Sequence, residues 1–469
     1  MIESIIYASP DILLLIGAMI MAGLHFSGKE NPRMYFLITK LFLMVSMFLS
    51  LIFYNKIFAE RYLTENSYTT MMKVIIYLLS IAWYYVSFKW FVGRNLSGSI
   101  YCICGLLLIE VFDIIISSVS LISLYIGIFL FIIFRNILIN HNMKTENMKS
   151  ENALFDTVVM LISLIGMLWI YKVCGSFSYE DIMLHLKENK PDILLCMSLA
   201  ATMAPLFYML TIFPLGFNNL NIAEKTILPV NGYISIISPL ALFSAVFVML
   251  NMMLAPVYEL FRPVIVVLSC LSMFYGAFGA KRETNLSIIF AYSAIYHFGV
   301  VLLIMSYMEA YAVLSAYVYF VIYILAAFGI YTSMYAFKSR GEYLTNIGDV
   351  AGIYQPLPYI AASVMILVLS MLGTPPLLGF LGRFYVTNQL FIAKDYVLVI
   401  LVLLPLGVLV SAYLKIIKSM YFEPRIKNFD RADKGIYISL FVNIILVLIT
   451  LFNNYEVVKI ARDVIYKLF

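Results

Sequence analysis

Apolar runs long enough to cross a bilayer repeat along nearly the whole chain. A transmembrane helix needs about 20 mostly apolar residues, and the sequence contains about fourteen such runs. Hydrophobic residues make up 63% of the chain and charged residues 12%, about half the charged share of a typical soluble domain. We therefore expect an all-α polytopic membrane protein of about 14 transmembrane helices embedded in the lipid bilayer. The predicted spans are centred near Ile16, Met47, Leu79, Leu106, Ile126, Leu164, Ala201, Pro239, Val267, Ile295, Ile324, Leu367, Leu404 and Ile444.

The segments between these runs are short. The longest polar stretches, residues 175–191 and 423–434, are too small to form a second domain with its own core. Residues 1–469 are therefore predicted to form a single membrane domain.

Lysine and arginine gather in alternate loops, and we count Arg94, Arg135, Lys281 and Arg282 among them. Because the basic loops of membrane proteins face the cytoplasm or matrix, both termini should face away from it. The net charge of +5 mostly reflects this bias. No soluble basic patch interleaved with aromatic residues is present in the sequence, so nucleic acid is not an expected partner.

The usual signatures of metal and cofactor sites are missing from the sequence. The five cysteines show no paired spacing, the four histidines are scattered, and no glycine-rich phosphate loop follows a strand pattern. We expect no metal site and no cofactor-binding site in this chain. Its chemistry should be that of ion transport, or should belong to partner subunits.

Arg383 is a cation inside the apolar run of residues 360–390. It follows a helix-breaking stretch that contains Pro375, Pro376, Gly379 and Gly382. A cation at this depth must face protein or water rather than lipid, and interrupted helices typically meet at ion sites. Arg383 is therefore predicted to mark an ion path.

A second helix interruption is expected at Pro205, inside the run centred near Ala201. A proline alone is a weak signal, because membrane helices also contain kinking prolines for packing reasons.

Several motifs of the second half resemble, in the same order, those of antiporter-like proton-translocating membrane subunits. They lie in residues 283–299, 319–329, 349–352, 372–385 and 411–422, and include the sequences TNL, AYSAIYHFG, DVAG, GTPPLLGFLGRFY and SAYLK. The set is most similar to the subunit N family of proton-pumping NADH:quinone oxidoreductase (complex I). Residues 280–425 carry most of this resemblance, and the earlier half agrees only in layout.

The resemblance implies two inverted five-helix repeats, each with one interrupted helix. The first repeat is expected in residues 99–255 and the second in residues 256–422. N-terminal spans in residues 1–98 and a C-terminal span in residues 423–469 would flank them.

The resemblance also implies a function. The chain would be a membrane-arm subunit that contributes to proton translocation coupled to electron transfer from NADH to quinone. NADH, FMN, iron-sulfur clusters and quinone would bind partner subunits, and this chain would hold no redox centre. Its partners would be other membrane-arm subunits, in a bacterial plasma membrane or a mitochondrial inner membrane.

Relay residues of the family are mostly replaced in this chain. The family uses a buried glutamate in the fifth span and lysines in the seventh, eighth and twelfth. Here the fifth span has no carboxylate, Ser198 and Pro239 occupy the first two lysine positions, and Arg383 occupies the third. Arginine stays protonated, so Arg383 is expected to act as a fixed electrostatic gate rather than a relay. The remaining proton-path candidates are Arg383, His297, Lys415, Glu110, Asp113, Asp156 and Lys172. Arg383 is expected to face an internal polar axis, with His297 and Lys415 close enough for water to bridge them.

Each candidate has a structural alternative. His297 could be a hydrogen-bonded interior histidine, Arg383 could cap the broken helix, and Lys415 could anchor its span at the interface. Three functions remain open. The chain could be a pumping subunit with substituted residues, or a divergent structural subunit with weak or no pumping. It could also be a cation/proton antiporter or membrane-hydrogenase subunit of the same superfamily.

Overall fold

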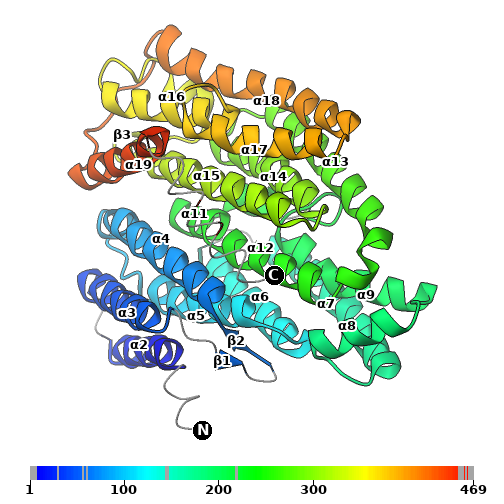
Figure 1. Cartoon of the computed structure of the whole chain (residues 1–469). Helices are drawn as coiled ribbons and strands as arrows, with labels where there is room; N and C mark the ends of the chain where they lie inside the picture. The colour runs from blue at the N-terminus through cyan, green and yellow to red at the C-terminus, as the bar shows by residue number, and fades with distance from the viewer. Residues whose placement is uncertain are drawn as a thin grey trace. The chain divides into compact units, whose positions relative to one another are not determined.

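Long apolar helices make up most of the computed structural model (Figure 1). The structure describes residues 8–28, 31–54, 58–59, 62–142, 147–216, 220–452, 459 and 462. Eleven helices among these residues are long and apolar enough to cross a membrane, and three shorter apolar helices accompany them. Every predicted span centre lies inside a described helix. The all-α, multi-pass membrane class is confirmed, whereas the count of fourteen spans and the inverted repeats stay predictions.

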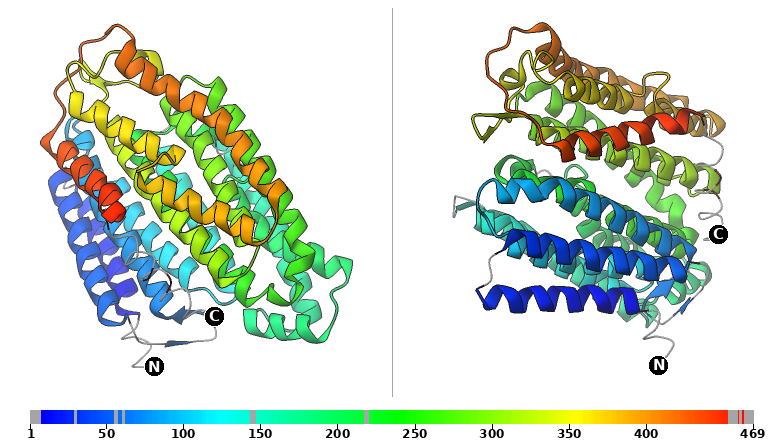
Figure 2. Two further views of the ribbon diagram at one scale, coloured as in Figure 1. Left: turned by 45° about the horizontal axis from the view of Figure 1, so that its top comes forward. Right: turned by 90° about the vertical axis from the view of Figure 1, so that its left-hand side faces the viewer.

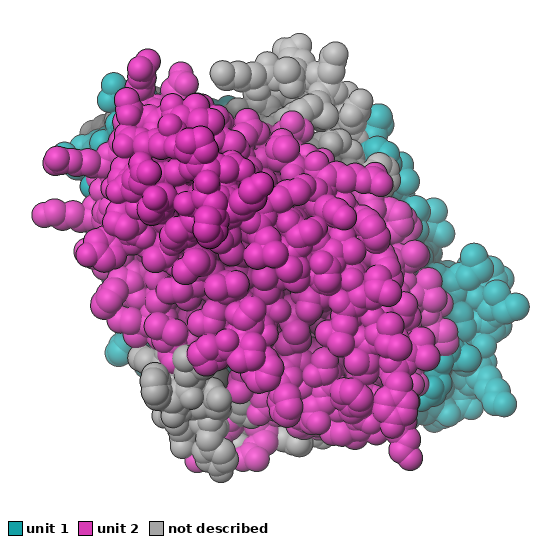
Figure 3. Space-filling model, turned by 90° about the horizontal axis from the view of Figure 1, so that it is seen from above, with its two compact units in different colours: residues 1–210, 225–261 teal, residues 211–224, 262–469 magenta. Residues whose placement is uncertain are grey.

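The chain divides into two compact units, which Figure 3 colours separately. Unit 1 comprises Met1–Leu210 and Lys225–Phe261, and unit 2 comprises Thr211–Glu224 and Arg262–Phe469. The predicted boundaries between N-terminal spans, repeats and C-terminal span stay predictions.

Unit 1 is built around α5, which packs against α2, α3, α4, α6 and α12. The helices α2, α3 and α4 lie side by side (Figure 2). Because α5 is apolar on most of its surface, it can be surrounded by helices on several sides. The elements of unit 1 are α2 (Ser9–Phe26), α3 (Pro32–Ile52), β1 (Phe58–Ala59), β2 (Thr64–Glu65), α4 (Ser67–Val92), α5 (Ser99–Ser117), α6 (Leu121–Asn142), α7 (Asn147–Cys174), α8 (Tyr179–Glu188), α9 (Ile193–Met209), α11 (Leu228–Ile236), α12 (Ser238–Met252) and the 3-10 turn η2 (Ala255–Val257).

Unit 2 is built around α15, which packs against α14, α16, α17 and α19. Two helices, α10 and α13, cross the boundary between the units in sequence. The elements are α10 (Leu220–Lys225), α13 (Tyr258–Arg282), α14 (Leu286–Met305), α15 (Ala310–Met334), β3 (Lys338–Ser339), β4 (Glu342–Tyr343), the 3-10 turn η3 (Ile347–Val350), α16 (Pro358–Leu372), α17 (Leu378–Ile392), α18 (Tyr396–Phe422) and α19 (Lys434–Phe452).

The apolar run around Arg383 forms two helices. α16 ends at Leu372, and α17 begins at Leu378. Pro375 and Pro376 lie between the two helices, where no helical hydrogen bond needs their missing N–H groups.

Gly379 and Gly382 lie in the first turns of α17 and allow close helix packing. A Cβ atom on Gly379 would stand 1.6 Å from the carbonyl oxygen of Ser370 in α16. A Cβ atom on Gly382 would stand 3.0 Å from Ile322 Cδ1 in α15. α17 can therefore lie against both helices only because these two positions lack side chains.

The structure corrects the break expected at Pro205. This residue lies inside α9, which continues to Met209. Neighbouring helices in a membrane protein stabilise such a helix although proline removes one backbone hydrogen bond. The run predicted around Pro239 is instead divided, because α11 ends at Ile236 and α12 begins at Ser238. Pro239 lies in the first turn of α12, where its missing N–H would have no helical partner anyway.

Candidate functional site

Arg383 lies in α17 and points back to the end of α16. Its side chain is buried, with Nη2 donating to the carbonyl oxygen of Met371 at 2.9 Å. Nη1 donates to the hydroxyl of Tyr296 at 3.1 Å, and that hydroxyl donates to the carbonyl of Val402 at 3.1 Å. Met371 is in the last turn of α16, where carbonyls have no partner within the helix and carry the negative end of the helix dipole. The arginine therefore caps α16 while its charge stays inside the protein.

Gly373 makes room for this arrangement. It follows the last residue of α16 with φ of 75°, a left-handed conformation that glycine adopts without strain. A Cβ atom at this position would stand 2.5 Å from Arg383 Nε. Both the turn and the arginine thus require glycine here.

His297 lies in α14 and is buried beside Tyr296 in the sequence. Its Nδ1 is 2.7 Å from the hydroxyl of Tyr319, and its ring stacks on Tyr323 at 4.4 Å between centroids. Nε2 is buried and has no hydrogen-bond partner among the described residues. His297 thus combines the hydrogen bond of a structural histidine with a ring nitrogen that can still take or give a proton.

Tyr413 of α18 completes this group. It is fully buried, and its hydroxyl bonds with that of Ser293 and donates to Met371 Sδ at 3.6 Å. The name "Arg383 site" denotes these buried side chains of unit 2: Arg383, Ser293, Tyr296, His297, Tyr319, Tyr323 and Tyr413.

The Arg383 site holds a buried positive charge among neutral dipoles. Among the described residues, no carboxylate forms a salt bridge with Arg383, and its hydrogen bonds go to a carbonyl and a phenol. Hydroxyl and imidazole groups can pass protons, whereas a guanidinium stays charged. The arrangement can therefore hold a fixed charge next to groups that exchange protons.

Lys415 does not join this site. Its side chain is exposed, and Nζ donates to the carbonyl of Lys281 at the end of α13, at 2.5 Å. Tyr413 lies two positions earlier on the same helix, which is about 200° around the helix axis. Because Tyr413 faces the site, Lys415 points away from it. The structure corrects its expected place beside Arg383.

A buried ion pair in unit 1 corrects the placement of Arg135. We expected this residue in a loop, but it is buried in α6, where Nη2 lies 2.8 Å and 2.9 Å from the two carboxylate oxygens of Asp156 in α7. Asn136 donates to the same carboxylate at 2.7 Å. The opposite charges offset each other's burial, so Asp156, a predicted proton-path candidate, is one half of an ion pair.

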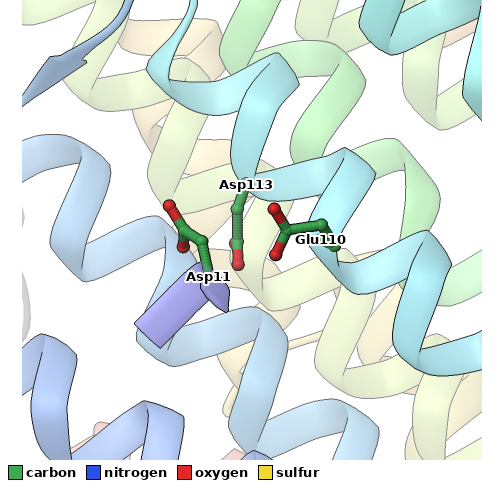
Figure 4. A group of neighbouring side chains, drawn as sticks. All are labelled: Asp11, Glu110 and Asp113. Atoms are coloured by element: carbon green, nitrogen blue, oxygen red, sulfur yellow. The ribbon is translucent and has the colours of Figure 1, made fainter. Parts of the chain in front are cut away.

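The other two predicted carboxylates, Glu110 and Asp113, lie in α5 and face Asp11 of α2. Carboxylate oxygens of these three residues all lie within 4.8 Å of one another (Figure 4). Lys73 of α4 lies beside them, with Nζ 3.2 Å from Asp11 and 2.6 Å from Glu65. The name "Lys73 cluster" denotes Asp11, Glu65, Lys73, Glu110 and Asp113.

Three cluster members, Asp11, Glu65 and Lys73, were missed as site candidates by sequence reasoning. The signal for Lys73 was available, because it is a cation inside an apolar helix, as Arg383 is. Glu65 gave no such signal, because it lies before the helix in a short hairpin strand.

Lys172 is a member of neither group. It is exposed in the last turn of α7, with its ammonium 4.5 Å from the centre of the Trp169 ring. A cation over an aromatic ring at a helix end is typical of an interface anchor.

A bundle of membrane-crossing helices, with one helix interrupted beside a buried cation, defines the class of multi-pass ion-translocating membrane proteins. The sequence model for the family described as "NADH:quinone oxidoreductase/Mrp antiporter, TM" matches residues 118–407. The chain belongs to this family.

Relatives and solved structures agree with this assignment. NADH-quinone oxidoreductase subunit N of Rickettsia felis is 27% identical over 290 residues, covering 61% of this chain and 63% of the relative. The subunit N of Parvibaculum lavamentivorans is 25% identical over 435 residues, covering 91% and 90%. A chain of respiratory complex I from Thermus thermophilus matches the fold with a TM-score of 0.80 and 17% identity, covering 96% and 98%. The match to the Rickettsia protein thus spans less than two thirds of that protein's length.

Proposed function

We propose that this chain is a subunit N-type component of the membrane arm of an NADH:quinone oxidoreductase. It contributes there to proton translocation coupled to electron transfer from NADH to quinone. One observation carries the proposal: the family match at residues 118–407 includes the interrupted helix α16–α17, and the buried Arg383 lies there beside a histidine and tyrosines. The names of the relatives from Rickettsia and Parvibaculum support it.

In this proposal Arg383 supplies a fixed charge and its neighbours move the proton. His297 takes a proton at Nε2 and releases one from Nδ1 toward the hydroxyl of Tyr319. The nearby guanidinium repels a second positive charge on the imidazole. Proton occupancy at His297 then depends on how strongly other charges of the membrane arm offset Arg383, which couples this step to events elsewhere.

Cofactors, partners and location follow from the same proposal. NADH, FMN, iron-sulfur clusters and quinone bind partner subunits, and this chain holds no redox centre. The partners are other membrane-arm subunits, in a bacterial plasma membrane or a mitochondrial inner membrane. Both termini face away from the cytoplasm or matrix.

Co-purification tests the assignment to complex I. A tagged full-length chain, extracted from its own membrane in mild detergent, should recover NADH-oxidising peripheral subunits and NADH:quinone reductase activity. Recovery of antiporter subunits alone would overturn the proposal and favour a cation/proton antiporter. Recovery of hydrogenase subunits would likewise favour the membrane-hydrogenase alternative.

A second candidate function is that of a structural subunit with weak or no pumping. Two side chains of unit 1 favour it. Ser198 replaces a relay lysine, and its hydroxyl bonds to the carbonyl of Leu194 in its own helix at 2.7 Å. Asp156 is held in the pair with Arg135. The number of protons moved per electron, compared between the natural complex and one with a disrupted Arg383 site, separates the two functions.

A further inference from the structure

The Lys73 cluster lies at one end of unit 1. Asp11 is near the start of α2 and Lys73 near the start of α4, whereas Asp113 is near the end of α5. Neighbouring antiparallel helices bring these ends together. All members of the cluster precede residue 118, where the family match begins. The cluster is therefore separate from the relay positions that the family resemblance implies.

Negative groups outnumber positive ones in this cluster. Four carboxyl groups surround one ammonium group, that of Lys73. Both carboxylate oxygens of Glu65 accept hydrogen bonds. Oε1 accepts from Lys73 at 2.6 Å and from Ser117 at 2.9 Å, and Oε2 accepts from Thr69 at 3.1 Å. Asp11 accepts from Lys73 at 3.2 Å. The ammonium group thus makes its hydrogen bonds to Glu65 and Asp11, and Glu110 and Asp113 are left without a bonded cation among the described residues.

Two carboxylate oxygens of the cluster are buried without a partner. Among the described residues, neither Glu110 Oε2 nor Asp113 Oδ1 has a hydrogen bond, although Asp113 is only 1% exposed. Adjacent carboxylates in a dry site cannot both stay ionised, and a shared proton removes the repulsion. The same proton would turn one carboxyl group into a donor toward its neighbours, whose oxygens lie within 4.8 Å.

The neighbouring donors indicate which carboxyl group holds the proton. Tyr77 donates to Asp113 Oδ2 at 2.5 Å, and a hydrogen bond to a carboxylate favours its ionised form. No described residue donates to Glu110 Oε2. These contacts favour the proton on Glu110, with Asp113 as its acceptor.

Other packed helices add no competing charge to these contacts. Helices α3, α6 and α12 also pack against α5. α12 contains no ionisable side chain. On α6 and α3, the charged residues closest to the helix end beside the cluster are Arg135 and Lys40. Each lies about 20 Å along its helix from that end. Among the described residues of α5 and the elements beside it, those that lie close to Glu110 and can ionise are Asp11, Glu65, Lys73, Asp113 and Tyr77.

We propose that the Lys73 cluster is a proton-binding site in which Glu110 carries an exchangeable proton and donates it to Asp113. A route to the surface exists within the cluster, because the side chains of Asp11 and Glu65 are 24% and 19% exposed while that of Lys73 is 4% exposed. The site gives unit 1 a proton-carrying carboxyl group although its fifth span has none. A role of this proton in translocation rests on the proposed function, but its presence on Glu110 does not.

Infrared difference spectroscopy tests the proton directly. The full-length chain is purified with the subunits that accompany it, and spectra of the natural protein and of Glu110→Gln are subtracted at neutral pH. The carbonyl stretch of a protonated carboxylic acid should disappear in the variant and should move to lower frequency in D2O in the natural protein. Absence of this band from the difference spectrum overturns the proposal.

Two further variants keep the test independent of folding in Glu110→Gln. Tyr77→Phe should shift the band, because Asp113 loses a donor and accepts more strongly from Glu110. Asp113→Asn should shift the band but retain it, and its loss there would place the proton on Asp113 and overturn the assignment. The control Glu188→Gln, an exposed carboxylate in α8, should leave the band unchanged.

A sodium titration excludes the main alternative occupant. Adding sodium chloride at constant pH should leave the band in place, as should the same concentration of choline chloride. Loss of the band with sodium alone would mean that the cluster binds a metal cation, which overturns the proposal. The number of protons moved per electron in Glu110→Gln is a separate readout, so that failure of the proposed function and failure of this site give different results.

Discussion

Arg383 donates a 2.9 Å hydrogen bond to the backbone carbonyl of Met371, so the buried cation of one half-helix closes the end of the other. The two interpretations of Arg383, helix cap and charge in an ion path, are therefore not exclusive. The same guanidinium holds Tyr296, the residue beside His297. Removing the cap and removing the charge should have separable effects.

Arg383→Ala should lower the number of protons pumped per electron more than it lowers NADH:quinone electron transfer. The variant removes the only fixed charge among the described side chains of the Arg383 site. It also leaves the Met371 carbonyl without its buried donor, which costs about 1–3 kcal/mol of stability. Proton uptake and NADH oxidation in proteoliposomes measure the ratio.

Arg383→Lys separates charge from cap. Lysine keeps a positive charge but cannot form the planar, two-armed contact with both Met371 and Tyr296. Pumping should be partly retained and thermal stability lowered. Lys172→Ala, at an exposed helix end, serves as a control and should change neither. Unchanged pumping in Arg383→Ala with intact assembly would favour the structural-subunit function.

His297→Phe should reduce pumping while leaving the fold nearly unchanged. The substitution keeps an aromatic ring for stacking on Tyr323 but removes both ring nitrogens. Tyr319 then loses its 2.7 Å partner, so a modest stability loss of about 1 kcal/mol is expected. A second variant, Tyr319→Phe, keeps the imidazole but removes the hydroxyl that receives the proton from Nδ1, so it should also reduce pumping. If both variants pump normally, His297 is a structural histidine.

Hydropathy predicted the helices well because burial in lipid imposes composition directly on each span. The position of Arg383 was predictable for the same reason, since a single charge in an apolar run is conspicuous. Which face of a helix points inward was harder to predict. Lys415 was expected near Arg383, but Tyr413 is the residue of α18 that faces the Arg383 site. Pro205 shows a related limit, because a proline's effect depends on its neighbours.

The Lys73 cluster was only half predictable. Glu110 and Asp113 were candidates, because each is a charge in an apolar run. Their proximity to Asp11 depends on how α2 packs against α5, and no local pattern encodes that contact. Arg135 and Asp156 are a similar case, because each residue alone suggested a span end and only the pair explains their burial.

Gly373→Ala should destabilise the protein. Alanine in the left-handed conformation costs about 1–2 kcal/mol, and its Cβ atom would stand 2.5 Å from Arg383 Nε. The arginine must then move, so pumping should fall together with the melting temperature. Gly348→Ala is the matched control, because a Cβ atom there meets no other atom within 4 Å and φ is not positive. Equal melting temperatures for the two variants would contradict the packing seen at Gly373.

Asp156→Asn should be among the most destabilising conservative substitutions in unit 1. It leaves Arg135 buried and without a counter-charge, and breaking a buried ion pair on one side costs about 3–5 kcal/mol. Replacing both residues together, as Arg135→Met with Asp156→Leu, should recover much of that loss because no unpaired charge remains. Assembly yield and thermal unfolding of the complex measure both variants. If the double variant is as unstable as Asp156→Asn, the contacts between Arg135 and Asp156 themselves stabilise unit 1, beyond the avoidance of an unpaired buried charge. If the double variant assembles and pumps normally, Asp156 is excluded from the proton path and the carboxyl groups of the Lys73 cluster become the carriers to test in unit 1.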